Sequence, residues 1–133
     1  MISAHLLAIP GASAYFIGGS VIYTRVAQRC LLGISDEQMD SLRASTENYA
    51  ALNAKTIRKS LGTTWGLSET GATGPTGNRY GDAAGHSCIG VDGPVSRTIT
   101  VETGVQQRDQ NMISFAKEAL LLLIDCLEAN SGV

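Results

Sequence analysis

The sequence has no excess of charge of either sign. Ten Lys and Arg residues stand against twelve Asp and Glu residues, which gives a formal net charge of -2. A chain with this balance has no positive field that would gather a polyanion. We therefore expect no nucleic-acid partner.

Long hydrophobic runs are missing as well. The longest unbroken apolar run extends from Ala119 to Ile124, far short of the roughly 20 residues that cross a bilayer. A short apolar stretch at the start ends in small residues, but no Lys or Arg precedes it and Pro10 interrupts it. It therefore does not have the pattern of a secretory signal, and no membrane association is expected.

Cysteine and histidine are scarce. Cys30, Cys88 and Cys126 are odd in number and widely spaced, which fits reduced thiols in a cytoplasmic protein better than a disulfide framework. His5 and His86 are the two histidines, too few for a typical zinc site. We expect no metal and no cofactor.

What the chain does have is a composition suited to one folded core. Hydrophobic residues make up 44% of its 133 residues and charged residues 17%. This size is typical of a single domain, and the hydrophobic content is too high for intrinsic disorder.

Capping residues and apolar residues at helical spacing predict five helical segments. They are residues 1–9, a short segment ending at Gly33, a segment from the Ser35–Gln38 capping box to about Arg43, a segment capped by Ser45 or Thr46 that ends at Gly62, and residues 109–128. The last carries the most regular apolar stripe, so it should pack on a sheet.

Four strands are predicted, at residues 16–24, 63–69, 83–91 and 95–103. The last two are joined through a short segment of Asp, Gly and Pro, which favours an antiparallel hairpin. Helices between strands, followed by a hairpin and a final helix, predict a three-layer α/β/α sandwich with a mixed sheet.

A glycine-rich stretch, TGATGPTGNRYGDAAG, occupies residues 70–85. It is neither a Walker A loop nor a Rossmann fingerprint, because no Gly-Lys-Ser/Thr follows and no helix opens on it. Such a loop can turn several backbone N–H groups toward one anion or carbonyl oxygen. It can equally be a solvated surface loop whose glycines only satisfy turn geometry.

Several short motifs occur in a recognisable order. They are Ile9-Pro10-Gly11, a predicted strand ending in Tyr23-Thr24, Leu32-Gly33-Ile34, Thr46-Glu47 at a helix start, and Thr70-Gly71-Ala72-Thr73-Gly74-Pro75. In this order they resemble the C-terminal domain of the CinA family, the nicotinamide-nucleotide amidohydrolases. The resemblance covers nearly the whole chain and implies one CinA-like domain over residues 1–133.

The resemblance implies an activity, hydrolysis of the carboxamide of nicotinamide mononucleotide to nicotinate mononucleotide and ammonia. It places Tyr23 and Thr70 beside the reacting group, where the Thr70 hydroxyl could donate to an oxyanion. It also implies that Gly71, Ala72, Thr73, Gly74 and Arg108 contact a nucleotide or carboxamide ligand. Tyr23 could instead be an ordinary half-buried aromatic, and Arg108 a solvated residue at a helix start.

Two departures from the family pattern argue against catalysis. The family's serine nucleophile precedes the helix that ends here at Ile9, and the sequence begins at Met1 inside that helix. Gln28 stands where the family has a lysine base, and a glutamine amide has no usable basicity. We expect an inactive or impaired amidase, or alternatively a non-catalytic ligand-binding or oligomerisation module. The first strand of the family's sheet is also missing, so we expect a homo-oligomer.

Four further polar residues are expected to have no role in a site. His86 and Cys88 alternate on one predicted strand face and have no evident third partner, so they are interpreted as a surface pair. Arg79 and Asp82 in the glycine-rich stretch are expected to be solvated, with ligand contact as the alternative.

Overall fold

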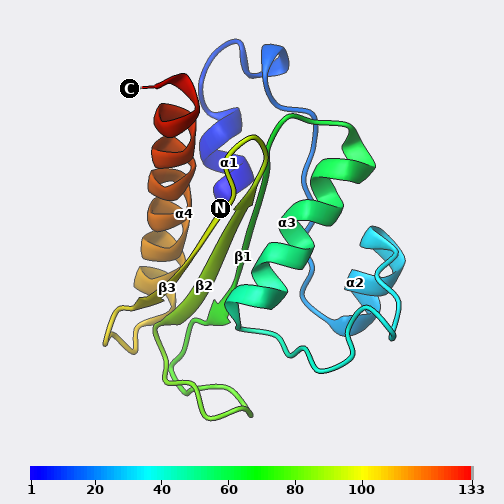
Figure 1. Ribbon diagram of the computed structural model, residues 1–133. Coiled ribbons are helices and arrows are strands. Elements are labelled where there is room, and N and C mark those ends of the chain that lie inside the picture. The colour runs from blue at the N-terminus through cyan, green and yellow to red at the C-terminus, as the bar shows by residue number, and fades with distance from the viewer. Residues whose placement is uncertain (133) are drawn as a thin grey trace.

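The middle layer of the protein is a three-stranded antiparallel sheet with the order β1-β2-β3. The structure is a computed structural model that describes residues 1–132. Its elements are α1 (Ile2–Leu7), a 3-10 turn (Ala12–Ala14), α2 (Arg25–Leu32), α3 (Glu47–Leu61), β1 (Gly66–Ala72), β2 (His86–Asp92), β3 (Arg97–Glu102) and α4 (Arg108–Ser131) (Figure 1).

Helix α3 covers one face of this sheet at very short range. A Cβ atom added to Gly90 of β2 would lie 2.8 Å from the carbonyl carbon of Ala50, and one added to Gly66 of β1 would lie 2.1 Å from the carbonyl oxygen of Ala54. Small residues on both surfaces therefore let helix and sheet backbones approach each other. Ala50 and Ala54 are fully buried as a result.

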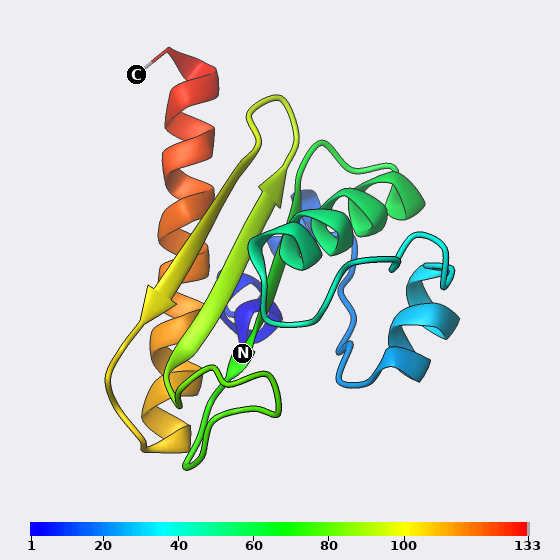
Figure 2. The ribbon, with the colours of Figure 1, turned by 60° about the horizontal axis from the view of Figure 1, so that its bottom comes forward.

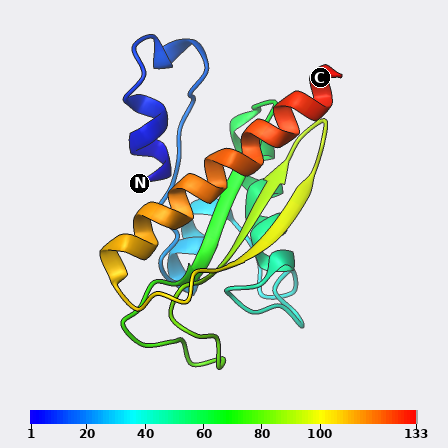
Figure 3. The ribbon, with the colours of Figure 1, turned by 90° about the vertical axis from the view of Figure 1, so that its left-hand side faces the viewer.

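Helix α4 covers the opposite face, where the main apolar core lies (Figure 2). Ile89 and Val91 of β2 pack there against Ala119, Leu122 and Cys126 of α4. Helix α1 lies against α4 on the same side of the sheet (Figure 3). The predicted three-layer α/β/α arrangement is confirmed, and so are the hairpin and the long final helix.

Local capping signals explain where the helices begin and end. The Thr46 side chain accepts a hydrogen bond from the Tyr49 N–H at 3.2 Å and so caps α3, and the Thr24 side chain caps α2 in the same way. Gly33 and Gly62 end these helices in the left-handed conformation, which glycine adopts without steric cost. The predicted helix ends are therefore confirmed.

The helix predicted from Ser35 to Arg43 is wrong. The capping box itself forms, because Ser35 N–H donates to Gln38 Oε1 and Gln38 N–H donates to Ser35 Oγ. Only turns follow it. Ser41 has a φ of 63°, a left-handed conformation that cannot continue a right-handed helix.

The strand predicted at residues 16–24 is wrong too. Residues 17–23 are irregular, and within residues 1–132 none of their backbone groups pairs with another backbone group. Both ladders that the structure describes are antiparallel, so the sheet differs from the mixed sheet expected. Residues 16–24, predicted as a fourth strand, do not join it.

No helix among the described residues combines the length and the apolar character that crossing a membrane requires.

Candidate functional site

The predicted site residues of the glycine-rich stretch lie where β1 ends. Gly71 and Ala72 belong to β1 itself and pair with Ser87 and His86 of β2. A Cβ atom on Gly71 would lie 2.3 Å from the His86 carbonyl oxygen. Strand pairing therefore leaves no room for a side chain at position 71. The loop itself begins at Thr73, after the end of β1.

Two residues of α4 hold the start of this loop. Asn111 is fully buried, and its Nδ2 donates to the carbonyl oxygens of Thr73 at 2.9 Å and Val105 at 2.8 Å. Arg108 Nη1 donates to the Gly74 carbonyl oxygen at 2.8 Å. Arg108 is thus brought to the glycine loop as predicted, but it contacts the loop's backbone. Asn111 was not predicted, although an amide inside an apolar helix stripe is an informative signal.

Thr70 is brought against the segment that leads into α3. Its Oγ1 accepts a hydrogen bond from the Ser45 N–H at 3.0 Å. Ser45 has a φ of 61°, which is uncommon for any residue other than glycine. One predicted site residue therefore stabilises an unusual backbone conformation in a neighbouring segment.

His86 and Cys88 are buried beneath that segment, so the prediction of a surface pair is wrong. The Ser45 carbonyl oxygen lies 2.8 Å from His86 Nε2 and 3.5 Å from Cys88 Sγ. His86 Nδ1 contacts the carboxylate of Glu102 at the end of β3, and Cys88 Sγ lies 3.7 Å from His86 Nε2. Cysteine, histidine and glutamate thus stand in the order of a catalytic triad.

The electrostatics of this trio do not favour a nucleophile. Burial alone would lower the pKa of His86, but its hydrogen bonds with Glu102 and Ser45 and the nearby charge of Asp82 outweigh burial and raise that pKa. Burial raises the pKa of the Cys88 thiol. The thiol therefore resists ionisation, and the thiolate is the form of cysteine that attacks a substrate. The three side chains form a hydrogen-bonding cluster.

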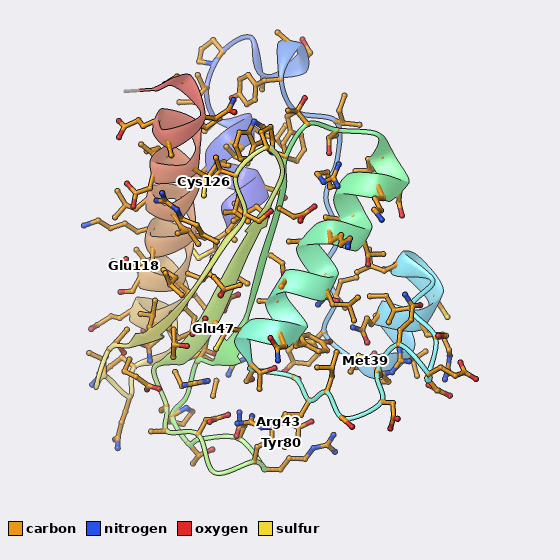
Figure 4. All side chains as sticks on the ribbon, in the orientation of Figure 1. Met39, Arg43, Glu47, Tyr80, Glu118 and Cys126 are labelled. Carbon is orange, nitrogen blue, oxygen red and sulfur yellow. The ribbon has the colours of Figure 1, made fainter. Side chains whose placement is uncertain are left out.

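Asp82 is also paired, so the prediction that it is solvated is wrong. Arg43 Nη1 lies 2.8 Å from Asp82 Oδ2, and this hydrogen bond lowers the pKa of the Asp82 carboxyl. The Arg43 guanidinium also lies over the Tyr80 ring, 4.8 Å from its centroid (Figure 4). Arg79 is exposed and stacks on the same ring. These contacts join the tip of the glycine-rich stretch to the segment before α3.

A shallow hollow of about 300 Å³ opens beside this cluster. Its walls come from the start of α3 and from β2 and β3, and the residues are Arg43, Ser45, Thr46, Glu47, Asn48, His86, Cys88 and Thr100. Hydrogen bonds from Thr100 and Thr98, each 2.6 Å long, lower the pKa of Glu47. The hollow is therefore lined by a carboxylate whose ionised form is favoured as well as by the Arg43 guanidinium.

Tyr23 and Gln28 lie on a different part of the molecule. Tyr23 is 80% exposed, so the half-buried alternative is wrong, and no hydrogen bond joins it to Thr70 within residues 1–132. Gln28 is fully buried. Its Nε2 donates to Asn53 Oδ1 of α3 at 2.8 Å and lies 3.4 Å from Met39 Sδ.

The described residues contain no group of three or more His, Cys, Asp or Glu side chains placed to hold a metal ion.

Sequence comparison relates the chain to the CinA proteins. A family model described as the CinA C-terminal domain matches residues 1–127. A CinA-like protein of Cyanothece sp. is 40% identical over 89 residues, 67% of this chain. A CinA-like protein of Salinibacter ruber is 32% identical over 120 residues, 90% of this chain. The matched segments span 21% and 29% of the length of these two relatives.

Solved structures share the fold at lower sequence identity. The competence damage-inducible protein A (ComA) of Klebsiella pneumoniae superimposes with a TM-score of 0.87 at 20% identity, covering 95% of this chain and 78% of that one. The competence/damage inducible protein CihA of Agrobacterium tumefaciens gives a TM-score of 0.83 at 24% identity, covering 94% and 77%.

Proposed function

Because the chain belongs to the CinA C-terminal domain family, we propose that it binds a small nucleotide or carboxamide ligand at residues 70–75 without hydrolysing the amide. The proposal treats residues 1–133 as one domain acting in the cytoplasm as a homo-oligomer. One observation carries it, the position of Gln28. Its amide is fully buried and bonded to Asn53.

Amide hydrolysis by a serine nucleophile needs a group that removes the serine proton. A lysine can do so when desolvation lowers its pKa, but a glutamine amide cannot. Gln28 moreover faces α3 and holds α2 against it through Asn53. The residue at the base position is therefore engaged in joining two helices.

The binding half of the proposal rests on how the loop is held. Asn111 and Arg108 fix the carbonyl groups of Thr73 and Gly74 from the α4 side. The half-buried Thr73 hydroxyl makes no hydrogen bond within residues 1–132, so it is available to a ligand carbonyl or phosphate oxygen. A preorganised loop of this kind binds without an added ordering cost.

The test combines calorimetry with an ammonia-release assay, using nicotinamide mononucleotide. We expect binding by the parent chain with no ammonia above the uncatalysed background. Thr73→Val should weaken binding about three- to tenfold, the range of one lost neutral hydrogen bond. Thr76→Val, in an exposed position of the same loop, is the matched control and should bind as the parent does.

The alternative is the hydrolysis that the resemblance implies. Ammonia release that Thr70→Ala abolishes would establish it and would overturn the proposal. Gln28→Lys on its own should still release no ammonia, because a base does little without its nucleophile. If neither the parent nor the Gln28→Lys variant binds the nucleotide, the glycine-rich stretch is a structural turn.

A further inference from the structure

In the segment before α3, the Ser45 peptide contacts the ends of strands β1 and β2. Its N–H donates to Thr70 Oγ1 of β1 at 3.0 Å. Its carbonyl oxygen lies 2.8 Å from His86 Nε2 of β2, with the weaker donor Cys88 Sγ at 3.5 Å. The left-handed conformation of Ser45 persists only where such contacts over-determine it.

His86 can make both of its ring contacts only when it is protonated. One nitrogen faces the Ser45 carbonyl oxygen and the other faces the Glu102 carboxylate. Both partners are acceptors, so both nitrogens must carry a proton, as they do in the imidazolium form. A neutral ring keeps one proton. The bond to a carboxylate is the stronger of the two, so that proton favours Glu102 and leaves the Ser45 carbonyl oxygen without a ring donor.

The groups that face His86 come from every element packed against it. Asp82 of the glycine-rich stretch lies 3.8 Å from Nε2, and Glu102 contacts Nδ1. Cys88 neighbours it on β2, and Arg43 stands behind Asp82. Glu47 at the start of α3 is bonded to Thr100, which contacts Cys88. Asp82 and Glu102, the two carboxylates that contact or approach the ring, favour the imidazolium.

We propose that His86 acts as a proton-dependent clasp that holds the Ser45 peptide against the ends of β1 and β2 when it is protonated and loosens it when it is neutral. Loss of the ring donor leaves the Ser45 carbonyl oxygen with only the weaker Cys88 donor and loosens the wall of the hollow formed by Arg43, Ser45 and Thr46. The clasp needs no ligand, so it stands apart from nucleotide binding.

Amide hydrogen exchange at Ser45, measured by NMR across the titration of His86, tests the clasp. Protection of the Ser45 N–H, corrected for the intrinsic pH dependence of exchange, should fall about tenfold as His86 loses its proton, which corresponds to one lost hydrogen bond. The imidazole resonances of His86 report that titration directly, and His5→Gln leaves a single histidine to follow.

Two variants distinguish the clasp from a general opening of the fold. In His86→Gln an amide can donate to Ser45 at every pH, so the pH dependence of protection should disappear. Glu102→Gln changes a mostly exposed side chain and should move the fall in protection to lower pH. Protection in the parent that does not change with pH, or a fall that persists unchanged in both variants, would overturn the proposal.

Discussion

Gln28 of α2 and Asn53 of α3 are joined by a buried side-chain hydrogen bond of 2.8 Å. The two residues are 25 positions apart in the sequence. Both amides are nearly inaccessible to solvent, so neither can replace its partner with water. The pair defines how α2 sits on the rest of the domain.

Asn53→Ala should lower the free energy of unfolding by about 1–3 kcal/mol, because it leaves the buried Gln28 amide without its acceptor. A double-mutant cycle with Gln28→Ala, followed by urea denaturation, should give a coupling of about 0.5–1.5 kcal/mol. Asn48→Ala on the exposed side of α3 is the control and should be nearly neutral. Additive effects in the cycle would mean that the amide pair contributes nothing.

Gly90→Ala should destabilise the fold by about 1–3 kcal/mol, the usual cost of overpacking. The new methyl group would meet the Ala50 backbone at 2.8 Å, so α3 would have to shift. Gly18→Ala provides the contrast, since its Cβ would lie 3.6 Å from a Leu61 methyl group, an ordinary contact. Equal melting temperatures for the two variants would argue against close packing of α3 on β2.

Sequence patterns predicted the elements whose signals are local. The caps at Thr46 and Gly62 and the stripe in α4 act within a few residues, so their helices formed as expected. The Ile, Val and Tyr side chains in residues 16–24 suit a strand, but a strand forms only where another strand pairs with it. The short sequence around Ser41 does not reveal a left-handed residue that ends a helix.

The site was less predictable because its contacts span long sequence distances. Arg43 meets Asp82 across 39 positions, and His86 meets Ser45 across 41. The sequence shows that these residues are present, but it does not show which of them contact each other in the fold. The resemblance identified Thr70, Gly74 and Arg108, and two of these, Gly74 and Arg108, are in direct contact.

Glu69→Gln should stabilise the protein at pH 7. Burial raises the pKa of the Glu69 carboxyl above its ordinary value of 4.5, despite a hydrogen bond from Ser87. Because the pKa of this carboxyl is raised in the folded state, its contribution to the free energy of unfolding is fully present below pH 4.5. That contribution is lost as the pH rises through the folded pKa.

The gain from Glu69→Gln should therefore be larger at pH 7 than at pH 4, as melting temperatures would show. The exposed Glu37→Gln variant controls for the change in net charge. A gain that does not depend on pH would contradict a buried carboxyl that resists ionisation.

Residues 17–23 should make the chain associate with copies of itself. Ile17, Val21 and Tyr23 are 65%, 83% and 80% exposed, while Phe16 and Ile22 are partly buried. The segment thus opens three large apolar side chains to solvent. Within residues 1–132 its backbone N–H and C=O groups are also unpaired with other backbone. Exposed apolar side chains beside unpaired backbone favour pairing between chains.

Light scattering of the purified chain should accordingly show a mass above 13.9 kDa that increases with concentration. Replacing Ile17 and Val21 together by Ser removes two of the three apolar side chains but leaves the partly buried side chains of the segment intact, so the mass should fall toward that of the monomer. Ile113→Ser on α4, another exposed apolar position, tests whether any such change has the same effect. Because the segment contributes little to the core, both variants should fold. A parent chain that stays monomeric at every concentration, or a double variant that associates as the parent does, would show that residues 17–23 do not drive self-association.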